Sequence, residues 1–130
     1  VQDRNHLRDE TMPEAFRKLG YDTAVIGKWH IHPSPSTIGF DYSLYPRVHH
    51  RHTGQEFIEN DVPGQVIDEY SVTFESDRVD TYLSSHRTEP FFLYYSISPP
   101  HMPLLDAPDE YLSMYNPNDI PLRPNVRLAR

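Results

Sequence analysis

The stretch TAVIGKWHIH, residues 23–32, predicts a buried strand that ends in a polar tail. Its first four residues are apolar or β-branched, which is typical of a strand covered on both faces. Gly27 follows, and then come Lys28, His30 and His32. Lys28 is one of only two lysines in the chain, so its position directly after a buried run suggests a specific role.

A helix is predicted just upstream of this strand. Thr11 can cap its first turn, Glu14 can complete a capping box, and Pro13 is tolerated there. Gly20 is a typical stop. An apolar face at helical spacing is predicted from Met12, Ala15, Phe16 and Leu19. The strand then covers residues 21–26, and helix, glycine and buried strand in this order are a unit of an α/β fold.

A second buried strand is predicted at residues 91–97, the most hydrophobic run of the chain. Its length and its aromatic residues favour a central strand over a helix. The helix before it is expected to have Ser76 as its cap and to end near Arg87. Neither apolar run alternates cleanly, which suits parallel strands.

The other segments have weaker patterns. Residues 32–45 are rich in proline and serine and are predicted to be a loop. Residues 47–64 fit either an edge hairpin or an irregular excursion, with turn residues at 62–64. A third helix is predicted over 108–115, and the tail from residue 116 is expected to pack little.

Composition limits the classes of function. With 130 residues, the chain has the length of one domain. Its net charge of −7 argues against general affinity for nucleic acid or anionic membrane. The absence of cysteine excludes disulfides, thiolate metal sites and a cysteine nucleophile within these residues. The first residue is Val and no signal-peptide pattern follows, so we expect an internal cut or a processed end.

The two predicted strands end in groups suited to bind an anion. Lys28 and His30 follow the first strand, and His101 follows the second in a loop that contains three prolines. Ligand sites of open parallel sheets form beyond the carboxyl ends of the strands. If the strands are parallel neighbours, these three side chains meet and form a positive pocket for an oxyanion.

Blander interpretations of the same residues remain open. A lysine after a strand is most often a solvated strand end, and a histidine in a proline-rich loop is most often a turn residue. A transition-metal site built from His30, His32 and the HHRH segment, residues 49–52, is a further alternative. An interaction fragment that binds sulfate or phosphate weakly through Lys28, without chemistry, is another.

Several motifs, in the same order and spacing, resemble the sulfatase family. The first is GYDTAVIGKWHIH at 20–32, which is similar to a family segment containing Gly-Lys-Trp-His. The second is PFFLYYSISPPHMPL at 90–104, which is similar to a family strand and its Pro-His-x-Pro loop. The elements GFDYSLY at 39–45, PDEYLSMY at 108–115 and DIPLRPN at 119–125 also match.

The resemblance implies an α/β fold like alkaline phosphatase, with a mostly parallel sheet flanked by helices. It implies hydrolysis of sulfate esters by a formylglycine held near Ca²⁺. Lys28 matches the family lysine that contacts sulfate, and His30 the histidine that bonds the formylglycine hydroxyl. His101 matches the histidine that binds sulfate and protonates the leaving alcohol. The chemistry agrees, since a transferring sulfuryl group needs fixed positive charge and an alkoxide leaving group needs an acid.

The sequence also departs from the family. The Cys/Ser-x-Pro-x-Arg motif and the acidic metal ligands are absent, and His32 stands where glycine is usual. We therefore expect residues 1–130 to be a single inner segment of a sulfatase catalytic domain, inactive alone and with no complete cofactor site. Phosphonate and phosphodiester hydrolases of the same superfamily share much of this pattern, so a phosphate ester remains an alternative substrate.

The expected partner is a small-molecule or carbohydrate sulfate ester, with residues 47–52 a candidate for the loop that selects it. Strand edges left open in such a segment also predict self-association. The resemblance is compatible with a periplasmic, secreted or lysosomal protein and does not choose among them.

Overall fold

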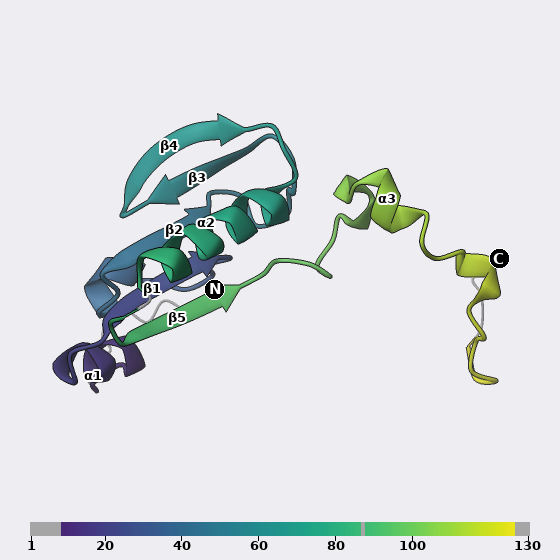
Figure 1. Ribbon diagram of the computed structural model, residues 1–130. Helices are drawn as coiled ribbons and strands as arrows, with labels where there is room; N and C mark the ends of the chain where they lie inside the picture. Colours follow the sequence, from purple (N-terminus) through teal and green to yellow (C-terminus); the bar gives the residue numbers. More distant parts are fainter. Residues whose placement is uncertain (1–8, 87, 127–130) are drawn as a thin grey trace.

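The computed structural model describes residues 9–86 and 88–126. Its strands form one five-stranded sheet in the order β4-β3-β2-β1-β5 (Figure 1). The strands are β1 (Asp22–Gly27), β2 (Tyr42–Pro46), β3 (Gln55–Glu59), β4 (Val62–Ile67) and β5 (Phe91–Ser96). The helices are α1 (Met12–Lys18), α2 (Ser71–Ser85) and α3 (Asp109–Leu112), with 3₁₀ turns η1 (Pro35–Ile38), η2 (Leu104–Asp106) and η3 (Pro117–Asp119).

Strand β1 pairs in parallel with both β2 and β5, which confirms the predicted parallel neighbours. Strands β2, β3 and β4 pair in antiparallel fashion, so the sheet is mixed. The expected central position of the 91–97 strand is wrong, because β5 lies at the edge of the sheet and β1 lies inside it. The three parallel strands β1, β2 and β5 therefore have their carboxyl ends at the same edge of the sheet, which we call the rim.

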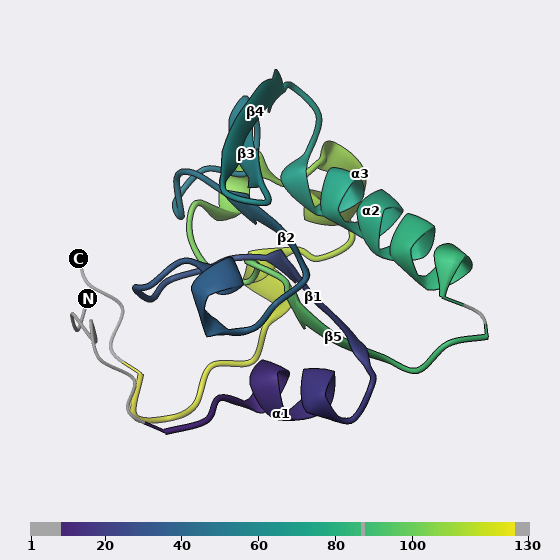
Figure 2. The ribbon, with the colours of Figure 1, turned by 90° about the vertical axis from the view of Figure 1, so that its left-hand side faces the viewer.

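Helices cover both faces of the sheet around β1 (Figure 2). Ala24 and Ile26 pack with Tyr82 of α2 on one face. Val25 points to the other face, where it packs with Ile38 of η1 and Phe40. Burial on both faces explains why the sequence of β1 is apolar without alternation.

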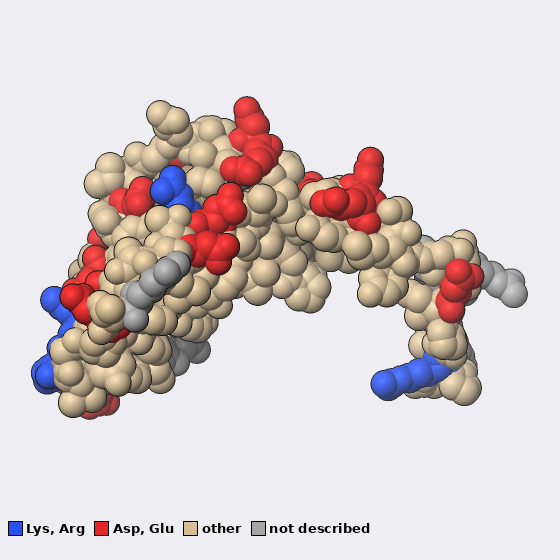
Figure 3. Space-filling view, in the orientation of Figure 1, with Lys and Arg blue, Asp and Glu red and all other residues tan. Residues whose placement is uncertain are grey.

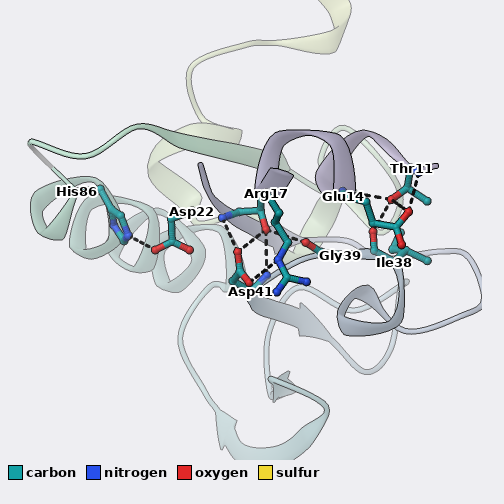
Figure 4. Close-up of polar contacts among 9 residues, drawn as sticks. Thr11, Glu14, Arg17, Asp22, Ile38, Gly39, Asp41 and His86 are labelled. Carbon is teal, nitrogen blue, oxygen red and sulfur yellow. Dashed lines mark hydrogen bonds and ion pairs between the residues drawn. The ribbon is translucent and has the colours of Figure 1, made fainter. Parts of the chain in front are cut away.

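The predicted start of α1 is confirmed. The Thr11 amide donates to Oε2 of Glu14 at 2.8 Å, and the Glu14 amide donates back to Oγ1 of Thr11 at 3.4 Å (Figure 4). The predicted apolar face is only half right, because Met12 and Leu19 are exposed while Phe16 stacks on Phe92 of β5.

Asp41 connects three elements at the amino end of β1 (Figure 4). Its Oδ2 accepts from the backbone amide and the hydroxyl of Thr23 at 3.1 and 2.8 Å. Its Oδ1 lies 2.9 Å from Nε of Arg17 in α1. A second contact nearby joins His86, after α2, to Asp22 at 2.5 Å. These contacts fix the amino end of β1, away from the polar tail at its other end.

Several segment boundaries differ from expectation. The predicted 32–45 loop contains η1 and most of β2. The 47–64 segment is a hairpin, but its turn lies at Asn60 and Asp61, which adopt φ of 49° and 66°, and residues 62–64 begin β4. Helix α2 starts at Ser71, not after Ser76, and ends at Ser85. Arg87, near which its end was predicted, lies outside the described residues.

The chain after β5 leaves the sheet as an extended arm, residues 97–126, that carries α3 (Figure 1). Helix α3 has four residues, so the predicted 108–115 helix is too long. Ile120 and Leu122, in the tail from residue 116, are 55% and 54% exposed, in line with the expectation that this tail packs little. Within residues 9–86 and 88–126 no helix combines the length and apolar character needed to cross a bilayer.

Acidic side chains recur across the face shown in Figure 3, on the body and on the arm, while basic ones occupy few places. This surface agrees with the net charge of −7 and gives no basic track for a polyanion. The basic groups of interest lie instead at the rim of β1 and β5.

Candidate anion site at the carboxyl ends of two strands

Lys28 is held at the rim by the pairing of β1 with β5. Its backbone amide donates to the carbonyl of Ser96 at 2.7 Å. Gly27, just before it, adopts φ of +101°, and a Cβ there would lie 2.3 Å from the same carbonyl. Only glycine lets the two backbones approach so closely. Lys28 is half-buried at this point, and His30, two residues on, is exposed.

His101 reaches the same rim from β5. Its backbone amide donates to the carbonyl of Ser98 at 3.1 Å, which forms a tight turn directly after the strand. Its imidazole is exposed. The rim of the sheet thus carries all three residues that the sequence predicted for the site.

The histidines of residues 49–52 connect these groups. The rings of His30 and His49 lie 4.5 Å apart, and so do the rings of His50 and His101. In the described part of the chain, Lys28, His30 and His101 form no hydrogen bond with one another. The ring contacts instead join His30 and His101 to the 49–52 segment. His49 is half-buried and His52 is buried, so the 49–52 segment is packed against the rim and is not a freely solvated loop.

His52 joins the 49–52 segment to the loop of His101. Its Nε2 donates to the carbonyl of His101 at 3.0 Å, because a carbonyl can only accept. Its backbone amide donates to Oδ2 of Asp106 at 2.9 Å, and its carbonyl accepts from the amide of Ser71 at 2.7 Å. His52 therefore connects the loop that carries His101, through its side chain, to the start of α2, through its backbone.

The electrostatic character of the rim is positive. Burial, and then the charges of His30 and Lys28, hold the pKa of His49 below its usual value. The pKa of His50 is lowered by burial and then by His101, Lys28 and His30. These shifts favour neutral imidazoles at His49 and His50, so Lys28 supplies the fixed positive charge beside them.

Glu75 lies beneath this rim and was not predicted as part of it. It is fully buried on α2, and both of its carboxyl oxygens lack a hydrogen-bond partner among the described residues. A Cβ on Gly27 would lie 3.4 Å from its Oε2. Burial raises the pKa of Glu75 to about 8, so at neutral pH the carboxyl is mostly protonated and leaves most of the positive charge above it unneutralised. Glu75 lies four and seven residues before Val79 and Tyr82, which are on the buried face of α2. This helical spacing was the signal in the sequence that could have predicted its burial.

A pocket of about 420 Å³ opens beside the rim. His30 and His49 are part of its wall together with Trp29, Tyr45 and Arg47. Lys28 and His101 are outside its lining. His32 also lines this pocket. The structure therefore places the charged groups and the adjacent pocket side by side.

The transition-metal alternative receives no support from the described residues. Among residues 9–86 and 88–126, no three His, Asp or Glu side chains come together as a metal site requires. His30 pairs with His49, and His50 pairs separately with His101.

Comparison with known proteins identifies the family. The sequence model of the sulfatase family matches residues 2–123. The chain belongs to the sulfatase family. It is 33% identical over 126 residues to an ulvan-active sulfatase of Formosa agariphila, with 88% of this chain and 25% of that protein covered. It is 26% identical over 127 residues to an N-acetylglucosamine-6-O-sulfatase of Bacteroides thetaiotaomicron, with 90% and 21% covered.

A solved structure supports the same assignment. A protein in complex with its substrate D-glucosamine-2-N,6-O-disulfate superposes with a TM-score of 0.63 at 26% identity, over 73% of this chain and 19% of that one. The sulfatase resemblance and the α/β fold expected from the sequence are thus confirmed. The chain spans a quarter or less of the length of each of these proteins.

The cofactors of the family do not fit the residues described here. Ca²⁺ requires several oxygen ligands, and the rim offers an ammonium and imidazoles. The chain has no cysteine and no Ser-x-Pro-x-Arg sequence that could supply formylglycine. None of the chemistry below is therefore assigned to either group.

Proposed function

We propose that the whole protein hydrolyses sulfate esters and that Lys28, His30 and His101 of this segment bind the sulfate. The observation that supports this most strongly is the pairing of β1 with β5, which brings Lys28 and His101 to one rim. The family membership supports sulfate as the anion.

Each residue has a chemical part in the reaction. The ammonium of Lys28 is a fixed positive charge for the sulfate oxygens, whose charge is redistributed in the transition state. His30, which forms part of the wall of the adjacent pocket, donates a hydrogen bond to a sulfate oxygen. His101 supplies a proton to the alcohol oxygen as its bond to sulfur breaks, and an oxygen that derives from water replaces the alcohol on sulfur. Water is consumed overall, and an alcohol, sulfate and a proton are released.

We further propose that the ester is a carbohydrate sulfate. One relative is named an N-acetylglucosamine-6-O-sulfatase and a structural neighbour holds a sulfated glucosamine. In this chain the pocket beside the rim has Trp29 and Tyr45 in its wall, and such aromatic faces suit the apolar face of a sugar ring. Residues 47–52 border the same pocket and remain the candidate for the selecting loop.

The test is hydrolysis by the whole protein of glucosamine 6-sulfate, 4-nitrophenyl sulfate and 4-nitrophenyl phosphate. We expect both sulfates to be turned over faster than the phosphate. Lys28→Ala should lower kcat/KM by about 10²–10³-fold, as loss of a transition-state charge contact does.

The matched control is Lys18→Ala, because Lys18 is the other lysine and pairs, at the end of α1, with Glu10. It should retain activity. Faster hydrolysis of the phosphate would favour the phosphodiesterase-like alternative. An equal loss in both lysine variants would contradict the proposed role of Lys28.

A further inference from the structure

His50 and His101 form an imidazole pair at the edge of the proposed site. Their Nδ1 atoms lie 3.3 Å apart, and the ring centroids are 4.5 Å apart at an angle of 42°. His50 comes from the β2–β3 connection and His101 from the loop after β5, so 51 residues of chain separate the two partners. Such a contact is a product of the fold and not of local sequence.

The neighbouring backbone determines which atom carries the proton. Nδ1 of His101 also lies 3.0 Å from the carbonyl oxygen of Met102. A carbonyl can only accept, so His101 carries a proton on Nδ1 and donates it there. Nδ1 of His50 faces the same proton and must therefore be the unprotonated, accepting nitrogen. In neutral His101 this leaves Nε2 as the only nitrogen free to face a ligand.

The loop around this pair is held in place independently. The backbone carbonyl of His101 accepts from buried His52, and the amide of His52 is bound by Asp106 of η2. The backbone of the His101 loop is thus fixed by His52, and the remaining freedom of the imidazole is rotation and proton placement. His50 is the side chain in contact with that ring.

We propose that His50 is a positioning residue: by accepting the Nδ1 proton of His101, it leaves Nε2 of His101 as the nitrogen that takes up a second proton and presents it to the bound sulfate ester. The role rests on the proposed function for the identity of the ligand, but the hydrogen bond itself does not. A second ring of the 49–52 segment, that of His49, pairs with His30 instead.

The charges around the pair prevent it from holding two extra protons. Lys28 and His30, at the end of β1, and His49 and His52, in its own segment, are the neighbouring basic groups, and Asp106 is bound to the His52 amide. A proton on Nδ1 of His50 would point at the Nδ1 proton of His101. The lowered pKa of His50, caused by burial and then by His101 and Lys28, agrees with an acceptor that stays neutral.

The test is nitrogen NMR of the protein labelled with ¹⁵N-histidine, at a pH where the imidazoles are neutral. His101 should show a protonated Nδ1 and a bare Nε2. His50 should show the opposite tautomer. This measurement needs no variant and no substrate, so it separates the hydrogen bond from hydrolysis. A protonated Nε2 on neutral His101 would overturn the proposal.

Two variants of His50 test whether its hydrogen bond determines the tautomer of His101. His50→Leu should raise the Nε2-protonated fraction of His101 about two- to ten-fold, as loss of one hydrogen bond predicts. His50→Asn keeps an accepting oxygen near the position of Nδ1 and should restore the original fraction. His32→Leu, at an exposed histidine outside the pair, should leave the tautomer of His101 unchanged. An unchanged tautomer in His50→Leu would show that the Met102 carbonyl alone positions the ring and would overturn the proposal.

Discussion

At the scale of single residues, Glu75 shows how strongly the fold changes the chemistry of a side chain. It is fully buried without a hydrogen-bond partner in the described chain, and its pKa is raised to about 8 by burial. Its usual value is 4.5, so folding favours the protonated form. The contribution of Glu75 to the unfolding free energy is fully present below about pH 4.5 and is lost as the pH rises towards 8. The reason is that the carboxyl of Glu75 loses its proton at a lower pH in the unfolded chain than in the folded one.

We therefore predict that Glu75→Gln increases the unfolding free energy by an amount that depends on pH. The difference in unfolding free energy between variant and parent should grow by roughly 1.4 kcal/mol per pH unit between pH 5 and pH 8. Urea unfolding at several pH values measures it. Glu69→Gln, at an exposed carboxylate just before α2, is the control and should show no such trend. A constant difference for Glu75→Gln across this range would contradict the account of a neutral buried carboxyl.

The site residues were predictable only in part. Lys28 and His30 could be placed because they directly follow a buried strand, and His101 because it follows another. The contacts of His50 and His52 could not, since both depend on a connection whose path is set by the pairing of β2 with β1. A histidine-rich segment by itself does not show which strand end it will reach.

At the scale of elements, the junction of β1 with its polar tail is the most constrained part of the fold. Gly27 and Gly20 both adopt positive φ, of +101° and +83°. A Cβ at Gly20 meets nothing within 4 Å, whereas one at Gly27 would lie 2.3 Å from the Ser96 carbonyl. A side chain at Gly20 would meet only the cost of a positive φ, whereas one at Gly27 would meet that cost and a steric clash.

This pair gives a direct comparison. Gly20→Ala should cost about 1 kcal/mol of unfolding free energy, the penalty for positive φ alone. Gly27→Ala should cost about 3 kcal/mol or more, because β1 and β5 must also separate. Thermal or urea unfolding of both variants measures the difference. Equal costs would mean that the close approach of β1 to β5 is not essential to the fold.

The sequence predicted elements well where the signal is local. The capping box at Thr11 and Glu14 and the apolar run of β1 are contained in a few neighbouring residues. Strand β2 was missed because its sequence includes serine and proline, and it becomes a strand by pairing with β1 and β3. The start of α2 was missed because Tyr70, at its N-cap, makes no side-chain capping bond.

At the scale of the whole molecule, the site lies where a compact sheet meets an extended arm. Within the described residues, the outer edges of β4 and β5 have no strand beside them. The arm exposes apolar side chains, Leu105 and Tyr115 among them. These features keep self-association a prediction for the segment, since open edges and apolar surface favour contact with another chain. They do not alter the rim, which the β1–β5 pairing forms by itself.

The central claim is that Lys28, His30 and His101 bind one tetrahedral anion. Its most direct test is titration of the labelled protein with sulfate, followed by NMR of the histidine rings and of the lysine ammonium groups. The account predicts that all three residues shift along one saturating curve, and that Lys28→Ala weakens this binding about ten-fold or more while Lys18→Ala leaves it unchanged. Shifts that follow different curves, or that are confined to residues away from this rim, would contradict it.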